Sequence, residues 1–383
     1  MKAVVFHGKD DLRVDTVPDP KIEQPTDAII KVASSAICGS DLHLFGDYVI
    51  KLEEGDILGH EPMGIVEEVG PEVTHIAPGD RVVIPFNISC GSCFMCDQDL
   101  YSQCETTGSR EHGKGAALFG YTHLYGGVPG GQAEYLRVPQ AHFGPIKVDH
   151  GPPDERFLFL SDVLPTAWQA VVYADTPKGG TLGVWGLGPI GQMCVRIGRH
   201  LGAERVIGVD FVPERLEMAK RWGAEVVDVR DVEDAATAVN EMTGGRGCDA
   251  VIDAVGMESG DETFLAKIAQ RLMIQADRLE AFRTAQGAVR RGGTLSLSGV
   301  YLGLEQNFPL GDLFDRQIQI RMGQANVRRW TPEILPLLTD EDPLGTEDLV
   351  THRLPLEQAP HGYDIFREKE DGAIKVVLDP TLS

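Results

Sequence analysis

Four cysteines crowd one fifteen-residue segment of the chain, CGSCFMCDQDLYSQC. They are Cys90, Cys93, Cys96 and Cys104, with the spacing C-x2-C-x2-C-x7-C. An ordinary apolar core has no need of thiols at this density, but four thiolates ~2.3 Å from one Zn²⁺ complete a tetrahedron. Such a site has no open position for a substrate. The spacing therefore predicts a structural zinc site, and any catalysis is expected elsewhere.

Two disulfides within this cluster are the alternative. The N-terminal sequence lacks the apolar segment of a secretory signal, so we expect a cytoplasmic protein. Thiols stay reduced in that compartment, which favours metal binding over disulfides. Cys194 and Cys248 lie in apolar stretches and are expected to be buried small side chains.

A glycine pattern, G-x-G-x-x-G, occurs in WGLGPIG at Gly186, Gly188 and Gly191. On its own such a pattern can be a plain turn. Here it follows an apolar run and opens a helical one, and Asp210 ends the next apolar run. The three glycines would allow a tight turn, close approach of a diphosphate to backbone amides, and close helix–strand packing. A carboxylate at Asp210 would bind the ribose hydroxyls and repel a 2′-phosphate, which predicts NAD rather than NADP.

A second candidate metal site is sparser. Cys38 lies in ICGSDLH, and His60 with Glu61 lies in LGHEPMG. Each of these alone is unremarkable, because a lone histidine is more often structural. Thiolate, imidazole and carboxylate together would leave the fourth position of a tetrahedral zinc open for an alcohol. A zinc ion there promotes loss of the hydroxyl proton, after which hydride can pass to a nicotinamide.

The elements that must position these residues fall into two regions. The first ~150 residues hold short β-branched runs such as AIIKVASSAI and DRVVIPF between glycines and prolines, which predicts a β-rich domain. Apolar runs then alternate with helical ones, which is typical of a doubly wound parallel sheet. Residues 262–290 read as a long helical stretch, and the tail as strands that rejoin the first domain. The predicted domains are 1–162 with 324–383, and 163–323.

Composition excludes two classes of partner. The 383 residues include 35 basic and 58 acidic side chains, a net charge of -23. This balance argues against binding to nucleic acid, which requires clustered Lys and Arg. No uninterrupted apolar run approaches ~18 residues, so no membrane span is expected.

The stretch GHEPMGIVEEVGPEV resembles the signature of zinc-containing alcohol dehydrogenases in the medium-chain dehydrogenase/reductase superfamily. CGSDLH, the four-cysteine segment, GLGPIG and the final strand follow in the family's order, so the resemblance covers essentially the whole chain. LSDVLPTAWQA and the cysteine segment look most like the branch of glutathione-independent formaldehyde dehydrogenases. The resemblance implies an α/β fold, with a GroES-like β-rich catalytic domain and a Rossmann cofactor domain. It also implies a zinc-dependent, NAD-linked enzyme for a small alcohol or aldehyde, assembled as a homodimer or homotetramer.

The resemblance also assigns roles to single residues. It implies that Cys38, His60 and Asp162 bind the catalytic zinc, and that Glu61 is a neighbouring group or occasional ligand. Asp41 would orient a zinc-bound imidazole.

Further implied roles concern the proton and the cofactor. Ser40 would bind the substrate oxygen and pass its proton, through the nicotinamide ribose, to His43. The implied cofactor contacts are Thr166, Gly186, Gly188, Pro189, Ile190, Gly191, Asp210, Arg215, Gly299 and Val300, with Thr166, Gly299 and Val300 at the nicotinamide and Arg215 at the adenosine.

The chain departs from the family pattern at two positions. Many members use cysteine as the third zinc ligand, whereas Asp162 stands there, and an aspartate leaves the zinc more electrophilic. As an alternative, Asp162 could simply cap a helix. Gly39 stands where some members carry a basic residue against the cofactor diphosphate. The glycine-rich and aromatic segment 108–139 reads equally as a substrate-pocket loop or as a plain surface loop.

Other functions remain open at this point. An aldehyde dismutase would keep NAD bound and shuttle hydride between two aldehydes, and a polyol or threonine dehydrogenase would differ only in its pocket. A non-enzymatic relative would have lost the zinc ligands, all of which are present here. The particular alcohol does not follow from the sequence.

Overall fold

The computed structural model describes residues 1–46, 52–255, 281–299 and 308–382. The chain divides into two compact units, the first formed by Met1–Pro165 and Ala325–Ser383 and the second by Thr166–Gln324. Val300 and most of the predicted helical stretch 262–290 lie outside the described residues. Residues 281–287 are helical, and a strand already begins at Val289.

The first unit is rich in strands, as the short β-branched runs predict. Its strands are β1 (Lys2–Gly8), β2 (Asp11–Thr16), β3 (Ala28–Ala36), β4 (Glu61–Val69), β5 (Arg81–Val83), β6 (Tyr135–Val138), β7 (Ile146–Lys147), β14 (His352–Pro355) and β15 (Val376–Asp379). Its helices are α1 (Gly39–Phe45), α2 (Asp154–Leu158), α9 (Val327–Ile334) and α10 (Ala359–Glu368). The longer helix α3 (Val163–Ala174) continues from the first unit into the second.

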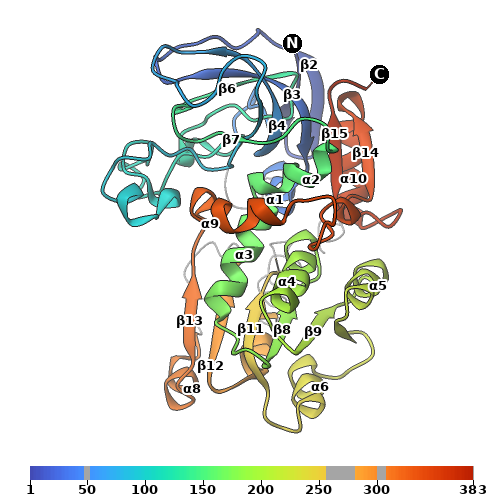
Figure 1. Cartoon of the computed structure of the whole chain (residues 1–383). Helices are drawn as coiled ribbons and strands as arrows, with labels where there is room; N and C mark the ends of the chain where they lie inside the picture. The colour runs from blue at the N-terminus through green and yellow to red at the C-terminus, as the bar shows by residue number, and fades with distance from the viewer. Residues whose placement is uncertain (47–51, 256–280, 300–307, 383) are drawn as a thin grey trace. The chain divides into compact units, whose positions relative to one another are not determined.

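Seven strands of the first unit form one sheet in the order β14-β15-β3-β4-β5-β7, with β6 also paired to β3 (Figure 1). Strands from the C-terminal tail therefore pair with a strand from the start of the chain. The apolar side chains of β3, β4 and β5, among them Ile30, Val66 and Val82, are buried in a common core. Burial of this apolar surface is the main force that holds the strands in this order.

The register of three neighbouring strands brings distant residues to one edge of this sheet. Ala36 at the end of β3 pairs with Glu61 at the start of β4. On the other side of β3, the same Ala36 pairs with Val377 of β15. Cys38, His60 and Lys375 lie within two residues of these paired positions, so the strand register alone places them close together.

The second unit is a six-stranded parallel sheet in the order β10-β9-β8-β11-β12-β13. Its strands are β8 (Thr181–Trp185), β9 (Arg205–Asp210), β10 (Glu225–Asp228), β11 (Cys248–Asp253), β12 (Val289–Leu297) and β13 (Gln319–Met322). Its further helices are α4 (Pro189–His200), α5 (Pro213–Arg221), α6 (Ala235–Met242) and α8 (Leu310–Asp315), of which α4 packs on β8 and β9 (Figure 1).

This strand order is that of a Rossmann sheet: successive strands are added on one side of β8 and then, from β11 onward, on its other side. Ligands of such sheets bind at the carboxyl ends of the strands, where the order changes side. The prediction of an α/β chain with a Rossmann domain is confirmed. Among the described residues no single helix has the length and apolar character of a membrane span; only the bent pair Asp154–Ser161 and Val163–Ala174 passes on length and composition.

Candidate metal and dinucleotide sites

Four side chains of the first unit that could bind a metal lie close together, beside the end of β3 and the start of β4. Cys38 immediately precedes α1, His60 and Glu61 lie at the start of β4, and Asp162 follows a short 3-10 helix, Phe159–Ser161. One ligand atom from each lies within 4.8 Å of all the others. The Oδ2 atom of Asp162 is 3.7 Å from Sγ of Cys38 and 3.5 Å from Nε2 of His60.

These separations fit a zinc ion. Ligand atoms at ~2.0–2.3 Å from a tetrahedral zinc lie ~3.3–3.8 Å from one another. The structure thus brings together the predicted set of Cys38, His60 and Asp162, although these residues are as much as 124 positions apart. Asp162 directs a carboxylate oxygen at the two other side chains, which a role confined to capping a helix would not require.

Asp41, on α1, connects two of these side chains. Its Oδ1 lies 3.1 Å from Nδ1 of His60, and its Oδ2 accepts a hydrogen bond from the backbone N–H of Cys38 at 3.0 Å. A carboxylate beside Nδ1 favours the tautomer with its proton there, which leaves the Nε2 lone pair for a metal. Asp41 is fully buried.

The charges in this cluster call for a cation. Burial alone would lower the pKa of His60, but the negative charges of Asp41 and Cys38 and the hydrogen bond to Asp162 raise this pKa well above its usual value. Burial, with a further contribution from the Glu61 carboxylate, raises the pKa of the Cys38 thiol. The buried acidic groups of the cluster are thus not fully neutralised by the positive charges around them. A divalent cation would supply the missing positive charge.

Glu61 is held by a buried lysine that the sequence analysis missed. Nζ of Lys375 donates hydrogen bonds to Oε1 of Glu61 at 2.7 Å and to the carbonyl of Ile37 at 3.0 Å. Oε2 of Glu61 has no hydrogen-bond partner among the described residues, so it keeps its full capacity as a ligand. The signal in the sequence was a lysine inside the otherwise apolar run AIKVVLD, a position where charge is expensive to bury.

Polar and aromatic groups lie around the cluster. Oγ of Ser40 is 3.3 Å from Nε2 of His60, and His43 lies three residues later on α1, mostly buried. The rings of Phe86 and Tyr121 stand edge-on to the imidazole, with centroids 6.3 Å and 6.5 Å away. Neither aromatic residue was predicted as part of the site. Because Tyr121 belongs to segment 108–139, that segment lines the cluster at this point.

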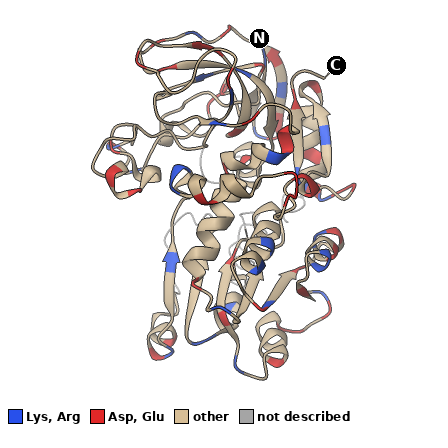
Figure 2. Cartoon of the chain, in the orientation of Figure 1, with Lys and Arg blue, Asp and Glu red and all other residues tan. Residues whose placement is uncertain are grey.

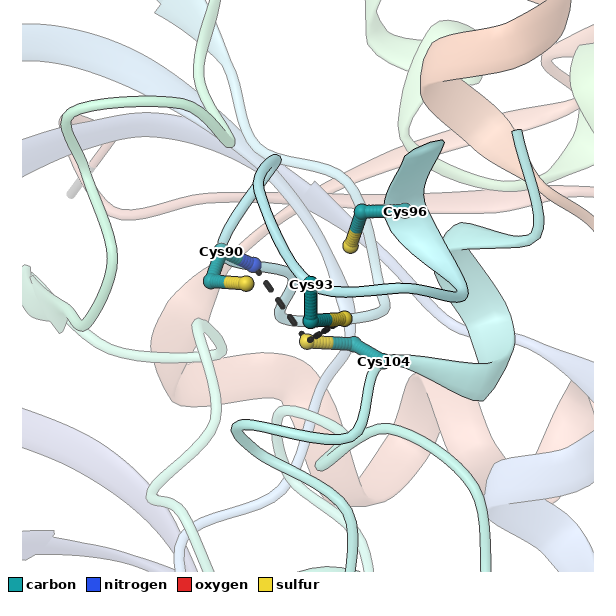
Figure 3. Close-up of side chains that lie close together, drawn as sticks. All are labelled: Cys90, Cys93, Cys96 and Cys104. Atoms are coloured by element: carbon teal, nitrogen blue, oxygen red, sulfur yellow. Dashed lines mark hydrogen bonds between the residues drawn. The ribbon is translucent and has the colours of Figure 1, made fainter. Parts of the chain in front are cut away.

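The four cysteines of the second cluster point toward one another from a compact loop (Figure 3). The sulfurs of Cys93 and Cys104 are 3.9 Å apart, close to the ~3.8 Å expected for two thiolates on a tetrahedral zinc. All seven cysteines of the chain are free thiols, so the disulfide alternative is not what the structure shows. Three of the four cluster thiols are buried.

Hydrogen bonds prepare two of these thiols to act as anions. Burial alone would raise the pKa of Cys90, but hydrogen bonds from the Thr106 hydroxyl and the Ser92 backbone outweigh it and lower this pKa to about 6. Burial alone would also raise the pKa of Cys93, but hydrogen bonds from the backbone N–H groups of Cys96 and Glu105 lower it, the latter at 3.3 Å from the sulfur. Thiolate, rather than thiol, is the form that binds zinc.

In the second unit, the glycine turn lies between β8 and α4, at the carboxyl end of the sheet. Gly186 has a φ of +82°, which side-chain-bearing residues rarely adopt. A Cβ on Gly191 would lie 1.8 Å from the carbonyl oxygen of Gly186, so only glycine permits this helix to approach the turn. Gly188 caps α4, and Pro189 and Ile190 form its first two positions. Because proline has no backbone N–H, the first-turn N–H groups that could bind an anion are those of Ile190 and Gly191.

Asp210 does more in the structure than the sequence suggested. Its Oδ2 accepts a hydrogen bond from the backbone N–H of Leu187 at 2.6 Å, and its Oδ1 accepts from Phe211 and Val212 at 2.6 Å and 2.9 Å. Nη1 of Arg215 lies 3.9 Å from the same carboxylate. Asp210 therefore ties the end of β9 to the glycine turn and places Arg215 beside it.

Two further residues, Thr166 and Gly299, were predicted to contact the nicotinamide. Thr166 lies near the start of α3, and Gly299 follows β12, where its N–H donates to the carbonyl of Asp253 at 3.1 Å. The roles of both residues at a nicotinamide stay predictions.

Comparison with known proteins follows the same division of the chain. Residues 24–148 match the alcohol dehydrogenase GroES-like domain, and residues 189–271 match the zinc-binding dehydrogenase family. The zinc-type alcohol dehydrogenase-like protein AdhB of Bacillus subtilis is 46% identical over 383 residues, which cover 99% of this chain and 100% of that protein. The chain belongs to the zinc-type alcohol dehydrogenase family.

Other members of this family resemble the chain over its full length. The solved structure of the alcohol dehydrogenase TADH from Thermus sp. ATN1 is 35% identical, with a TM-score of 0.85 and 99% of each chain covered. A formaldehyde dismutase of Pseudomonas putida is 32% identical over 99% of this chain and 97% of its own length. The protein is therefore a zinc-type oxidoreductase, and the prediction of an enzyme of this class is confirmed.

Proposed function

We propose that this dehydrogenase interconverts a small-molecule alcohol and its aldehyde or ketone, with NAD as the hydride acceptor and donor. The observation that carries the proposal is the buried cluster of Cys38, His60, Glu61 and Asp162, whose ligand atoms lie within 4.8 Å of one another. This donor set suits a zinc ion that keeps a position for substrate, unlike the closed set of four cysteines.

In this proposal Cys38, His60 and Asp162 hold the catalytic zinc, and Glu61 serves as an occasional fourth ligand. When bound there, zinc would supply Lewis-acid polarisation of the substrate oxygen, and NAD would serve as hydride acceptor or donor. A second, structural zinc belongs to Cys90, Cys93, Cys96 and Cys104.

Residues of the chain itself would carry away the proton of the substrate hydroxyl. Ser40, whose Oγ lies 3.3 Å from Nε2 of His60, would accept a hydrogen bond from the substrate hydroxyl. We assign His43, on the same helix, to carry the proton on toward solvent, because imidazole titrates near neutral pH. Asp41 keeps His60 in the tautomer that a metal ligand requires.

For the cofactor, we propose that the turn of Gly186, Gly188 and Gly191 binds the diphosphate at the start of α4. Asp210 and Arg215 would bind the adenosine ribose, and the nicotinamide would lie near Thr166 and Gly299. Residues 1–162 with 324–383 would then form the catalytic domain, and residues 163–323 the NAD-binding domain.

A glutathione-independent formaldehyde dehydrogenase or aldehyde dismutase is the second candidate within the same chemistry. Support for it is the resemblance of LSDVLPTAWQA to that branch and the 32% identity with the formaldehyde dismutase. The higher identity with a zinc-type alcohol dehydrogenase-like protein favours the general alcohol dehydrogenase.

We further propose a homodimer or homotetramer in the cytoplasm. Exposed apolar side chains on α8 and on the edge strand β13, among them Phe314 and Met322, support self-association, and light scattering of the purified protein tests it. The free state of all seven thiols supports a reducing compartment, and cell fractionation tests that.

The decisive experiment is turnover of a panel of alcohols and aldehydes, formaldehyde and polyols included, with NAD or NADP, followed by the absorbance of the reduced nicotinamide. We expect activity with added NAD, and two zinc ions per chain by elemental analysis. A dialysed protein that retains the absorbance of NADH and converts aldehyde without added cofactor would favour the dismutase.

Two matched cysteine variants test the division between the metal sites. Cys38→Ala should fold, retain one zinc and lose turnover, whereas Cys93→Ala should lose stability or assembly because it opens the structural site. A Cys93→Ala protein of full stability that lacks only activity would contradict the assignment. A wild-type protein with one zinc or none would contradict the two-site proposal.

A further inference from the structure

A chain of buried hydrogen bonds extends from the candidate zinc site to the C-terminal helix of the first unit. Gln132, in the segment before β6, donates from Nε2 to Oδ2 of Asp41 at 3.3 Å and to the carbonyl of Ala36 at 3.4 Å. The hydroxyl of Tyr363, on α10, donates to Oε1 of Gln132 at 2.8 Å. Asp41, Gln132 and Tyr363 are all fully buried.

The donors and acceptors fix the direction of this chain. A backbone carbonyl and a carboxylate can only accept, so the NH₂ group of Gln132 must face Ala36 and Asp41. Its carbonyl oxygen then faces Tyr363, whose hydroxyl must donate. No other orientation of the Gln132 amide satisfies all three neighbours, and a buried polar group left without a partner costs about 1–3 kcal/mol. Tyr363 therefore locks the amide that contacts Asp41.

Gln132 also contacts the backbone that leads into His60. The backbone N–H of Gln132 donates to the carbonyl of Leu58 at 3.0 Å. A Cβ placed on Gly59, which directly precedes His60, would lie 2.3 Å from Cγ of Gln132, so the glutamine side chain packs against this turn. One residue thus braces both the imidazole's backbone and the carboxylate that orients its ring.

From this geometry we propose that Gln132 and Tyr363 are positioning residues of the catalytic metal site. They hold Asp41 at Nδ1 of His60, which keeps Nε2 available to zinc. The inference rests on the proposed zinc site of Cys38, His60 and Asp162. Partners that orient a metal ligand typically contribute about 10–100-fold to metal affinity, and the same range is expected here.

The test is the rate at which zinc leaves the protein for a chromophoric chelator. Tyr363→Phe deletes only the hydroxyl and should speed release from the Cys38 site about tenfold, with no change in release from the four-cysteine site. Cys38→Ala, which removes the first site, identifies which kinetic phase belongs to which metal. Gln132→Met, which keeps the length of the side chain, should have at least as large an effect.

A matched control separates positioning from stability. Thr346 is fully buried in the same unit, its hydroxyl donates to Oδ1 of Asp342 at 3.1 Å, and neither residue belongs to either candidate metal cluster. Thr346→Val should lower the unfolding midpoint as Tyr363→Phe does, yet leave both zinc-release rates unchanged. The double variant of Tyr363→Phe and Gln132→Met should release zinc no faster than the quicker single variant, because the two act through one chain.

The outcomes are distinct. Unchanged release from the Cys38 site in both Tyr363→Phe and Gln132→Met, with only a lower unfolding midpoint, would overturn the inference and make the chain structural. A wild-type protein that binds zinc only at the four cysteines would instead overturn the proposed function on which the inference rests.

Discussion

The carboxylate of Glu61 and the ammonium of Lys375 lie 2.7 Å apart, and neither side chain is exposed to solvent. Burial lowers the pKa of a lysine, but the charge of Glu61 reverses this, and the net pKa of Lys375 is raised. The lysine therefore stays charged and holds one oxygen of Glu61, while the other oxygen remains with the candidate metal ligands. At the scale of residues, this pair leaves only one oxygen of Glu61 able to bind a metal ion.

We predict that Lys375→Met destabilises the protein by about 3–5 kcal/mol, measured by chemical denaturation. Methionine preserves the length of the side chain, so the loss comes from a buried carboxylate without its counter-charge. Adding Glu61→Gln in the same chain should recover most of the loss. A cost of less than about 1 kcal/mol for the single variant would mean that the pair behaves like an exposed one.

At the scale of elements, hydrogen bonds join the glycine turn and helix α4 to the end of β9. The N–H of Leu187 is bonded to Asp210, and Gln192 of α4 donates to the carbonyls of Leu187 and Arg215 at 2.9 Å and 2.8 Å. These bonds fix the turn from both sides. A ligand at the start of α4 would therefore meet a rigid surface, which lowers the entropic cost of binding.

Two alanine substitutions in this turn should behave differently. In Gly191→Ala the new Cβ would meet the Gly186 carbonyl, so we expect destabilisation by about 1–3 kcal/mol together with loss of NAD binding. In Gly188→Ala the nearest atom to the new Cβ is Nη1 of Arg215, at 3.8 Å, so the fold should be kept. Binding of NAD should still weaken about tenfold if the diphosphate approaches this glycine.

Thermal unfolding and calorimetric titration with NAD separate the two effects. Equal stability of Gly191→Ala and the wild type would contradict the packing argument. Unchanged NAD affinity in Gly188→Ala would remove this glycine from the binding surface.

At the scale of the whole molecule, the charge is strongly unbalanced, with 58 acidic and 35 basic side chains. Lys and Arg are nevertheless interspersed with Asp and Glu along the chain (Figure 2). Interspersion reduces local repulsion, but the net charge of -23 still opposes the compact state. Screening should therefore stabilise the fold.

We predict that raising NaCl from about 0.01 M to about 0.5 M at pH 7 raises the midpoint of thermal unfolding by roughly 2–4 °C. Salt also weakens surface ion pairs, but each of these contributes only ~0–1 kcal/mol. At pH 5, close to the isoelectric point of about 4.8, the net charge nearly vanishes and the salt effect should vanish with it. A midpoint that falls with salt at pH 7 would show that ion pairs outweigh the repulsion.

The sequence predicted those parts of the sites that are local. The four cysteines lie within fifteen residues, and the glycines within six, so spacing alone restricts their geometry. The alternation of apolar strands with helices likewise predicted the parallel sheet, since strands buried on both faces need continuous apolar runs. Such patterns were sufficient to predict the fold class and the enzyme family, and the comparisons confirm both.

What the sequence did not supply are contacts between distant segments. Lys375 meets Glu61 across 314 positions, and Tyr363 meets Gln132 across 231. Tyr121 was read only as part of a loop with two equal interpretations. Only Lys375 carries a local signal, as a lysine inside an apolar run, and even that does not name its partner. The neighbours of all these residues are set by how distant segments pack together.

By itself, then, the sequence determined which residues could bind zinc and a dinucleotide, because those motifs depend on residue type and short spacing. The family resemblance had already grouped Cys38, His60 and Asp162, but only the tertiary structure decided that Lys375 lies beside them, against Glu61. The physical reason is the strand register at Ala36, which pairs with Glu61 on one side and with Val377 on the other. A shift of one residue would turn these side chains to the opposite face of the sheet and separate the ligands.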